Sequence, residues 1–188
     1  MSGCLIIGII VIGFAVVVIF WWIGVYNKLI RLRNGCDKSW AQIDVQLKRR
    51  YDLIPNLVET VKGYAKHEKE TLQGVVKARQ QAIDAGSMGD QAQAEGFLTE
   101  ALGKLFALAE AYPDLKANQN FLDLQNELST LESAIALMRQ AYNDAAVVYN
   151  NTCQVFPNSV VASMSSFEPR EYFEVRDAEI REAPKVSF

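Results

Sequence analysis

Histidine and the common catalytic motifs are nearly absent from this chain, and their absence narrows the chemistry that it can perform. The one histidine, His67, lies between Lys66 and Glu68 on a polar stretch, where we expect it to be solvated. A single histidine cannot supply the two Glu-x-x-His pairs of a di-metal site in a helical bundle. No CxxC, HExxH or Walker A motif occurs either. We therefore expect no catalytic residue, no metal and no cofactor.

Cysteine is scarce as well, with three residues in a chain of 188. They do not form the pattern of a disulfide framework. Cys36 and Cys153 are isolated in the sequence, and we expect both to be small packed residues rather than reactive thiols. Cys4 is expected at the outer edge of a membrane, and no apolar stretch precedes it as a lipoprotein signal would require.

Net positive charge is missing too. The formal net charge is −3, although residues 28–50 carry seven basic and two acidic side chains. The rest of the chain therefore has a clear acidic excess. Such a balance lacks the basic footprint of a nucleic-acid-binding protein, so we expect no nucleic-acid partner.

A long charge-free run near the N-terminus decides the class of the protein. Residues 5–26 contain no charge in 22 positions, and fifteen of them are Leu, Ile, Val or Phe. A helix of that length spans ~33 Å, against a hydrocarbon core of ~30 Å. These fifteen side chains favour insertion by about 5 to 9 kcal/mol. A cleaved signal peptide fits less well, because no basic residue precedes the run and it ends in aromatic residues. We predict a transmembrane anchor over residues 1–27.

Aromatic and basic side chains follow this run. Aromatic rings suit the bilayer–water boundary, and basic residues stay on the cytoplasmic side, where each contributes ~1 kcal/mol with anionic lipid. We therefore predict a single-pass protein of the bacterial inner (plasma) membrane, with a short N-terminus outside and residues from about 27 onward in the cytoplasm. The predicted membrane-interface residues are Trp21, Trp22, Tyr26, Lys28, Arg31 and Arg33.

Apolar residues then recur every three or four positions, as is typical of amphipathic helices. The stripe from Cys36 to Ala65 predicts a long helix that continues out of the membrane and bends at Pro55. A second helical stretch covers roughly residues 68–85. It either continues the first helix or turns back, and the sequence leaves both alternatives open.

Turn signals separate the next helices. We predict a loop at residues 86–90 with Asp90 as an N-cap, and a helix over about 91–111 that ends at the break 112–114. The carboxylates of these segments are scattered, and we expect them on outer, solvated helix faces. We accordingly expect an interior packed by Leu, Ile, Ala and aromatic side chains.

The last helix has the most regular stripe, from Phe121 to Tyr149, with spacings that alternate between three and four. Such a stripe needs facing helices with matching apolar seams, as in coiled coils. We predict an all-α fold in which a single transmembrane helix precedes an antiparallel up-and-down four-helix bundle over residues 28–156. Residues 157–188 then form a short helix capped by Ser159 and an irregular tail that packs on the bundle or the membrane. Four tail aromatics support its order: Phe167, Tyr172, Phe173 and Phe188.

If the helices run up and down, the last one returns to the membrane. Its end would then lie near the lipid headgroups and could form a second membrane contact. The candidate residues for this contact are Val160, Val161, Met164 and Phe167.

The triplet Lys48-Arg49-Arg50, followed by Tyr51, is the one local basic cluster. Arg50 lies about 36 Å beyond Tyr26 along a straight helix, which is too far for lipid headgroups to be felt through salt. Two interpretations remain. The cluster forms ion pairs with acids on neighbouring helices, or it forms a docking site for an acidic partner through Lys48, Arg49, Arg50 and Tyr51.

Several motifs resemble those of the LemA family, and together they extend over essentially the whole chain. They are residues 34–58 (NGCDKSWAQIDVQLKRRYDLIPNLV), 64–68 (YAKHE), 112–117 (YPDLKA), Tyr149-Asn150, Phe156-Pro157 and 183–186 (APKV). The resemblance implies a bacterial membrane protein with a short outside N-terminus and a cytoplasmic four-helix bundle. It implies no catalytic activity and no cofactor.

These features favour a non-enzymatic, membrane-anchored scaffold that binds protein partners or other copies of itself. A homo-oligomer would form through bundle faces or lipid, because Gly8 and Gly13 do not make the GxxxG spacing of close helix packing. A signalling adaptor that works with a partner protein is the alternative. An enzyme with an unrecognised site is a further one, and a pocket that gathers Arg49, Tyr51, Asp52 and a carboxylate of the last helix would support it.

The predicted orientation can be measured with reporters fused after Phe188. Because basic flanks stay in the cytoplasm, a fluorescent reporter that matures only there should be active. Alkaline phosphatase, which is active only outside, should be inactive at the same position. The opposite pattern of the two reporters would reverse the topology.

Overall fold

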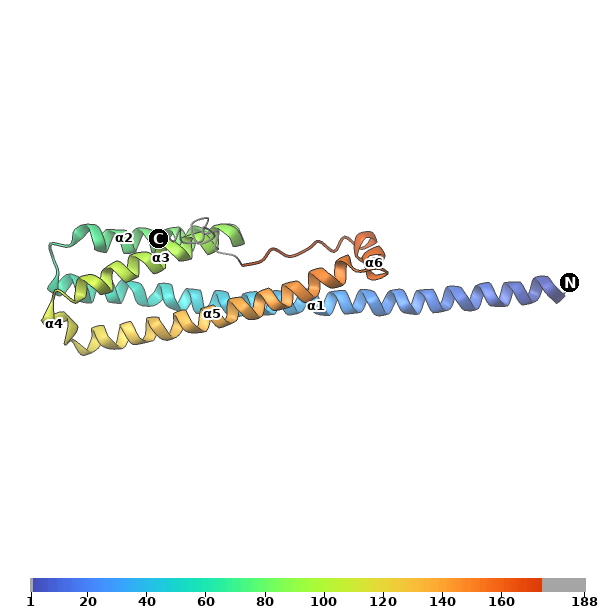
Figure 1. The fold of residues 1–188 in the computed structure, drawn as a ribbon, viewed down its shortest axis with the longest axis horizontal. Coiled ribbons are helices and arrows are strands. Elements are labelled where there is room, and N and C mark those ends of the chain that lie inside the picture. Colours follow the sequence, from blue (N-terminus) through green and yellow to red (C-terminus); the bar gives the residue numbers. More distant parts are fainter. Residues whose placement is uncertain (1, 174–188) are drawn as a thin grey trace, which may run out of the picture. The chain divides into compact units, whose positions relative to one another are not determined.

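The computed structural model describes residues 2–173, apart from the side chains of residues 2, 4 and 5. The predictions for the Cys4 side chain and for the tail beyond Phe173, including Phe188, lie outside the described residues. Regular structure within residues 2–173 is helical throughout, so the predicted all-α class is confirmed (Figure 1). The helices are α1 (Ser2–Tyr64), α2 (Lys69–Asp84), α3 (Met88–Ala109), α4 (Pro113–Lys116), α5 (Gln119–Gln154) and α6 (Asn158–Met164).

Helix α1 contains both the apolar run and the amphipathic stripe in one helix of 63 residues. The predicted continuity of the two is therefore confirmed. Pro55 lies inside α1 with its ring exposed, so the ring does not displace the core. The predicted bend at Pro55 stays a prediction. Helix α1 ends at Tyr64 and α2 begins at Lys69, which answers the open question about residues 28–85: they form two helices.

The chain divides into two compact units. Unit 1 comprises residues 1–41 and 141–171, and unit 2 comprises residues 42–140 and 172–188. Helices α1 and α5 each contribute a segment to both units. The predicted domains 1–27, 28–156 and 157–188 were drawn from composition, and their boundaries stay a prediction.

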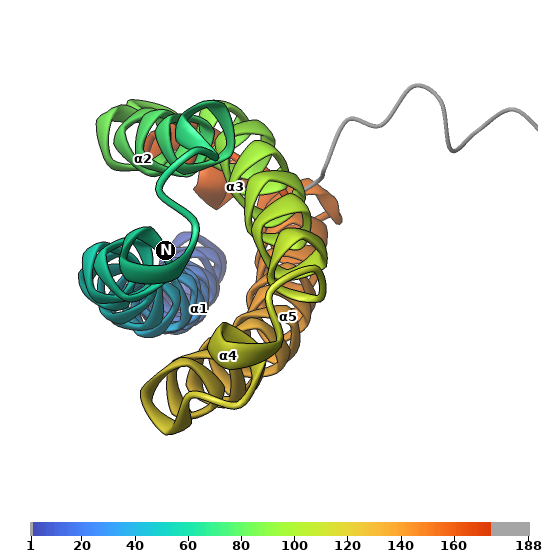
Figure 2. The same cartoon turned by 90° about the vertical axis from the view of Figure 1, so that its left-hand side faces the viewer.

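Unit 2 contains the predicted four helices, as segments of α1 and α5 together with α2 and α3. Successive helices reverse direction along the chain, and the end-on view shows α2, α3 and α5 around the unit 2 segment of α1 (Figures 1 and 2). Apolar side chains at helical spacing form its core because each helix buries one stripe. The best-buried members are Ile43, Ile54, Leu57, Val61, Val75, Leu98, Leu105, Leu115 and Ile135.

The turn before α3 differs from the prediction. Ser87, not Asp90, is the N-cap of α3: its Oγ accepts a hydrogen bond from the Asp90 backbone N–H at 3.1 Å. The Ser87 hydroxyl also donates to the Asp90 carboxylate at 2.7 Å. A serine at the cap and an acid three residues later pair with free backbone donors and interact favourably with the helix dipole. The helix therefore begins at Met88, earlier than the predicted start at about residue 91.

The break after α3 agrees with the prediction. Helix α3 ends at Ala109, and Pro113 occupies the first turn of the short helix α4. Asn118 then starts α5 by accepting a hydrogen bond from the Phe121 backbone N–H at 3.1 Å. A proline at a first turn and an asparagine at a cap are typical of helix starts.

Unit 1 is built from its segments of α1 and α5, from α6, from a turn at residues 165–166 and from a segment without regular structure, residues 167–171. Side chains of α5 hold this segment by its backbone. The Tyr142 hydroxyl donates to the carbonyl of residue 171 at 2.9 Å, and the Tyr149 hydroxyl donates to that of residue 168 at 3.0 Å. Asn150 both donates to the carbonyl and accepts from the N–H of Arg170, at 2.8 Å each. The irregular tail is therefore ordered over these residues.

Helix α6 follows a turn at Phe156-Pro157. Pro157 holds the cap position and no side chain caps the helix, so the predicted cap at Ser159 is wrong. Ser159 lies one residue inside α6, where its backbone N–H donates to the Val155 carbonyl at 3.0 Å. Ser166, with φ of 54°, ends this region in the left-handed conformation, and the N–H of Phe167 returns to the Ala162 carbonyl at 3.0 Å.

Because Tyr149 is buried in unit 1, we expect the stability of the folded chain to depend on pH. Burial, followed by a hydrogen bond with Cys153, raises the pKa of Tyr149 from 10.0 to about 12. The folded state therefore binds this proton more tightly than the unfolded state does, and stability present below pH 10 should be lost as the pH rises toward about 12. Urea unfolding of the full chain in detergent across this range measures the loss.

The matched comparison is Tyr149→Phe against Tyr172→Phe, since the Tyr172 side chain is exposed. The slope of unfolding free energy with pH should become flatter in Tyr149→Phe only. An equal slope in both variants would contradict the assignment to Tyr149.

Candidate functional site

A group of polar side chains meets within unit 2, where the sequence predicted an apolar interior. Three of its members, Arg50, Tyr51 and Glu95, are buried, and the others reach the surface at least in part. Its members come from three helices: Arg50 and Tyr51 from α1, Gln91, Glu95 and Thr99 from α3, and Arg139 from α5. We call these six residues the Glu95 cluster. Arg50 is 2% exposed and Glu95 is 1% exposed, so both charges are removed from water.

The Glu95 carboxylate is the centre of the cluster. Its Oε2 accepts a hydrogen bond from Arg50 Nη1 at 3.0 Å and lies 3.6 Å from Arg139 Nη2. Its Oε1 accepts from the Tyr51 hydroxyl and, at 3.3 Å, from Gln91 Nε2. Three hydrogen-bond donors, from Arg50, Tyr51 and Gln91, and the nearby Arg139 guanidinium therefore converge on one carboxylate.

Further contacts fix the two arginines. Arg50 Nη2 donates to Thr99 Oγ1 at 2.9 Å, and the Arg139 guanidinium lies 4.3 Å from the centroid of the Phe173 ring. A guanidinium over an aromatic face is attracted by the ring quadrupole. Phe173 thus covers the side of Arg139 that faces away from Glu95.

Helix α2 is attached at the same level. Arg79 Nε donates to the backbone carbonyl of Tyr51 at 2.7 Å, and Gln91 Nε2 donates to the Ala82 carbonyl at 3.1 Å and to the Tyr51 hydroxyl at 2.8 Å. All four long helices of unit 2 therefore meet in one polar layer. A mutual slip of any two helices would leave buried donors unpaired, which is costly.

The electrostatics of the cluster keep the proton on the Tyr51 hydroxyl. Burial, followed by the hydrogen bond to Glu95, raises the pKa of Tyr51 above its ordinary value. At neutral pH the tyrosine therefore stays protonated and acts as a donor, not as a base or nucleophile. The arrangement is suited to fixing the register of the helices.

The structure separates the predicted docking residues into two pairs. Lys48 and Arg49 are exposed, and Arg49 Nη2 lies 3.4 Å from Glu127 Oε1 on α5. Arg50 and Tyr51 are buried in the Glu95 cluster, because they occupy the side of α1 that faces α3. These two therefore do not present a surface to a partner, and the ion-pairing interpretation holds for Arg50.

Sequence reasoning missed Glu95, because it placed the acidic residues on solvated faces. That expectation is wrong at this position. Glu95 lies in the buried seam of α3 with Leu98, Leu102, Leu105 and Ala109, at spacings of three and four. The stripe that the sequence predicts for this helix comprises Ala94, Leu98, Ala101, Leu105, Leu108 and Tyr112. It shares Leu98 and Leu105 with the buried seam. An acidic residue in phase with an apolar seam was the available signal.

Two hollows lie beside the bundle helices of unit 2. One, of about 310 Å³, is lined by Tyr51, Asp52, Asp44, Lys48 and Arg79 among others. It contains two members of the pocket that would support an enzyme, but neither Arg49 nor a carboxylate of α5. Of its charged side chains, Arg79 donates to the Tyr51 carbonyl, while Asp44, Lys48 and Asp52 are exposed.

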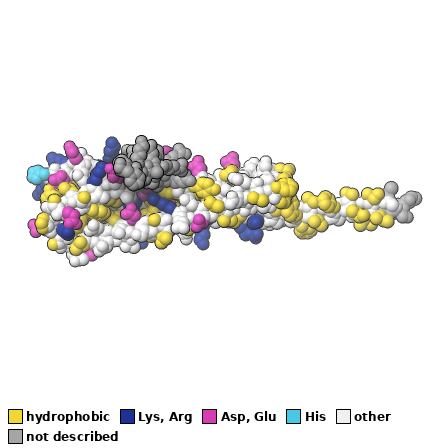
Figure 3. Space-filling model, in the orientation of Figure 1, with side chains coloured by type: hydrophobic (Ala, Val, Ile, Leu, Met, Phe, Trp, Pro, Cys, Tyr) yellow, Lys and Arg dark blue, Asp and Glu magenta, His cyan; other side chains and the backbone are white. Residues whose placement is uncertain are grey.

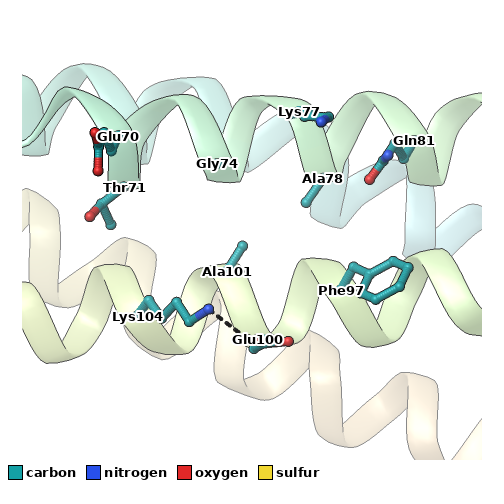
Figure 4. A pocket seen from close by; sticks show the side chains of 10 residues that line it. All are labelled: Glu70, Thr71, Gly74, Lys77, Ala78, Gln81, Phe97, Glu100, Ala101 and Lys104. Carbon is teal, nitrogen blue, oxygen red and sulfur yellow. Dashed lines mark ion pairs between the residues drawn. The ribbon is translucent and has the colours of Figure 1, made fainter.

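The other hollow is a groove of about 580 Å³ between α2 and α3 (Figure 4). Its middle is lined by small residues, Gly74, Ala78 and Ala101, while the Glu100–Lys104 ion pair and Phe97 flank it. Among the residues whose side chains the structure describes, no three metal-ligating groups come together. The groove therefore brings together no set of metal ligands among these residues.

The predicted membrane residues lie in unit 1. Trp21 and Tyr26 are exposed and Trp22 is half-buried; Lys28 and Arg31 are exposed, and Arg33 is half-buried. For the predicted second contact, the structure leaves only Val160 and Met164 exposed. Val161 and Phe167 are buried, because they are the residues by which the α6 region packs within unit 1.

Comparison with known proteins identifies the family. The sequence model of the LemA family matches residues 39–188. The chain belongs to the LemA family. The match begins after the apolar run and includes all six members of the Glu95 cluster.

Individual relatives agree with this assignment. The magnetosome protein MamQ 2 of Paramagnetospirillum magneticum is 24% identical over 179 residues, which cover 81% of this LemA-family chain. MamQ of Magnetospirillum gryphiswaldense gives the same identity and coverage. The protein LemA of Metamycoplasma hominis is 28% identical over 145 residues, or 76% of this chain. In each case the match spans 66% of the relative's own length.

The Glu95 cluster generates a stability prediction. Glu95→Ala leaves the buried Arg50 guanidinium and the half-buried Arg139 guanidinium without their shared carboxylate, and breaking a buried ion pair from one side costs about 3–5 kcal/mol. Chemical unfolding of the detergent-solubilised full chain, followed by circular dichroism, measures the free energy. Glu100→Ala is the matched control on the same helix, since its pair with Lys104 is exposed, and it should leave stability nearly unchanged. Equal stability of the two variants would show that the cluster does not hold the helices.

Proposed function

We propose that this chain is a membrane-anchored, non-enzymatic scaffold whose helical bundle presents binding surfaces on the cytoplasmic side. The observation that carries the proposal is the continuity of α1. One helix extends from an exposed apolar stretch, with a mean hydropathy of 3.0 over eighteen residues, into the core of unit 2. The apolar run and the segment that packs in unit 2 therefore belong to one helix.

The exposed apolar stretch supports the anchor. Its large side chains are open on all faces of the helix, with Ile9 71%, Phe14 70% and Phe20 71% exposed. A stretch that no other part of the described chain covers needs an apolar solvent. A helix satisfies all its internal backbone hydrogen bonds, which allows it to cross a bilayer. The basic residues Lys28 and Arg31, which remain exposed, support the cytoplasmic orientation.

The side chains of unit 2 support a scaffold. Its buried charged side chains, Arg50 and Glu95, pair with each other between α1 and α3, while Lys48 and Arg49 remain exposed on α1. Arg49 makes one loose ion pair with Glu127, and exposed pairs of this kind contribute little to stability. We infer that Lys48 and Arg49 form the docking site for an acidic segment of a partner protein.

One experiment tests both parts of the proposal: proximity labelling in living cells from an enzyme fused after Phe188 of the full chain. In Ile10→Arg/Val17→Arg, two arginines oppose insertion by about 5–7 kcal/mol, which cancels most of the apolar gain. This variant should move to the soluble fraction and label soluble proteins. Lys48→Glu/Arg49→Glu should stay in the membrane but lose its labelled neighbours, because the acidic partner is repelled.

Lys62→Glu is the matched control, since Lys62 is an exposed lysine of unit 2 on the same helix. It should label the same neighbours as the unchanged chain. Retention of the double-arginine variant in the membrane would contradict the anchor. An unchanged set of neighbours in Lys48→Glu/Arg49→Glu would contradict the docking site.

A further inference from the structure

The end of α5 and the whole of α6 lack charge. Residues 145–167 contain no Asp, Glu, Lys, Arg or His in 23 positions, a run as long as the anchor itself. Unlike the anchor, this run is rich in Ser, Asn and Gln, and it turns at Phe156-Pro157. It therefore does not cross a membrane as one helix, but it carries no charge that would oppose contact with lipid.

Within this run, residues 155–164 expose four large apolar side chains. Their exposed fractions are 58% for Val155, 79% for Phe156, 43% for Val160 and 72% for Met164. We call these four residues the apolar tip. Val160 and Met164 are four residues apart and share one face of α6, while Val161 and Ala162 on its other side are buried. Helix α6 therefore has two apolar sides. One packs within unit 1, and the other is exposed.

The contacts of Phe167 place this region along α1. The Phe167 ring packs edge-to-face on Tyr26, with centroids 5.6 Å apart, and the Arg33 guanidinium lies 5.3 Å from its centroid. Burial on α1 also begins here, at Val25 and Leu29. The packing within unit 1 therefore starts at the level where the charge-free run of α1 ends.

The surface view shows the same arrangement. Yellow apolar atoms gather over the α6 region, at the end of the packed part of unit 1 from which the bare apolar part of α1 emerges (Figure 3). Lys28 and Arg31, exposed on α1, lie in sequence between Tyr26 and Arg33, the two residues that contact Phe167. An apolar surface, two exposed cations and an apolar helix thus meet at one level of the unit.

We propose that the apolar tip inserts into the headgroup region of the bilayer that α1 crosses, as a second contact beside the anchor. The inference rests on the proposed membrane anchoring. Lipid fits the open face because side chains at the headgroup boundary can bury apolar area without crossing. The flanking cations favour anionic headgroups and disfavour a second copy of the same unit, which would bring like charges together.

The second contact fixes the orientation of unit 1. A single spanning helix can rotate about its axis and tilt, since hydrophobic length alone does not set either angle. A tip held in the same leaflet removes the rotation and limits the tilt. The basic side chains Lys28 and Arg31 are then presented to the membrane in one fixed arrangement.

Depth-dependent fluorescence quenching of the full chain tests the proposal. The native cysteines, Cys4, Cys36 and Cys153, are replaced by alanine, and a single environment-sensitive dye is attached to Phe156→Cys or to Met164→Cys. The chain is reconstituted into vesicles of phosphatidylcholine and phosphatidylglycerol that contain lipids spin-labelled either near the headgroup or deep in the acyl chain. Both dyes should be quenched by the shallow label more strongly than by the deep label. Adding Val160→Asp to the Phe156→Cys chain should reduce this quenching.

Two further dye positions make the outcomes distinguishable. A dye at Val17→Cys, in the anchor, should be quenched by the deep label, and a dye at Asp144→Cys, exposed about 18 Å earlier along α5, should be quenched by neither. Circular dichroism confirms that each variant retains its helix content.

The results separate the inference from the proposed anchor. Quenching at Val17 without quenching at either tip position overturns the inference and leaves the anchor intact. A blue-shifted tip dye that no lipid quenches shows that protein covers the tip, and this also overturns the inference. A Val17 dye that is not quenched overturns the anchor and the inference together.

Discussion

The continuity of α1 is the constraint on which the rest of the structure depends. A peptide backbone can leave water for lipid only if its polar groups are already paired, and an unbroken helix meets this condition along its whole length. Because the same helix continues to Tyr64, the apolar run and the stripe that packs unit 2 belong to one hydrogen-bonded element.

Much of this fold could be predicted from the sequence, because it follows from periodicity and from length. The charge-free run, the break at Pro113 and the long apolar stripe of α5 each correspond to an element of the structure. Local turn chemistry was harder. Ser87 and Asp90 both suit a helix start, and only the three-dimensional course of the chain decides between them. Composition alone also could not define compact units in which α1 and α5 each take part twice.

The candidate site was predicted less well, for a physical reason. A rule that places charged residues on solvated faces is correct on average, but it fails where partners from other helices compensate the charge. Glu95 is such a case, since its partners Arg50 and Arg139 lie 45 and 44 positions away in the sequence. The same limit applies to α6: Val161 and Phe167 look as suitable for lipid as Val160 and Met164 do. Only packing within unit 1 distinguishes them.

The buried charges also bear on specificity. Replacing a buried ionic group by apolar side chains often preserves stability, so such groups are not retained for energy alone. The Glu95 carboxylate contacts side chains of α1, α3 and α5 at once. A change in the register of any of these helices would break at least one of these contacts, so the cluster adds a dependence on register to the apolar core.

The way in which α5 holds residues 168–171 decides which of their side chains can be exchanged. Tyr142, Tyr149 and Asn150 bind main-chain carbonyls and one main-chain N–H, not side chains. Substitutions at Glu168 and Glu171 should therefore leave the backbone path of the segment intact. Arg170 differs, because its guanidinium also donates to the Asp37 carboxylate on α1 at 2.6 Å.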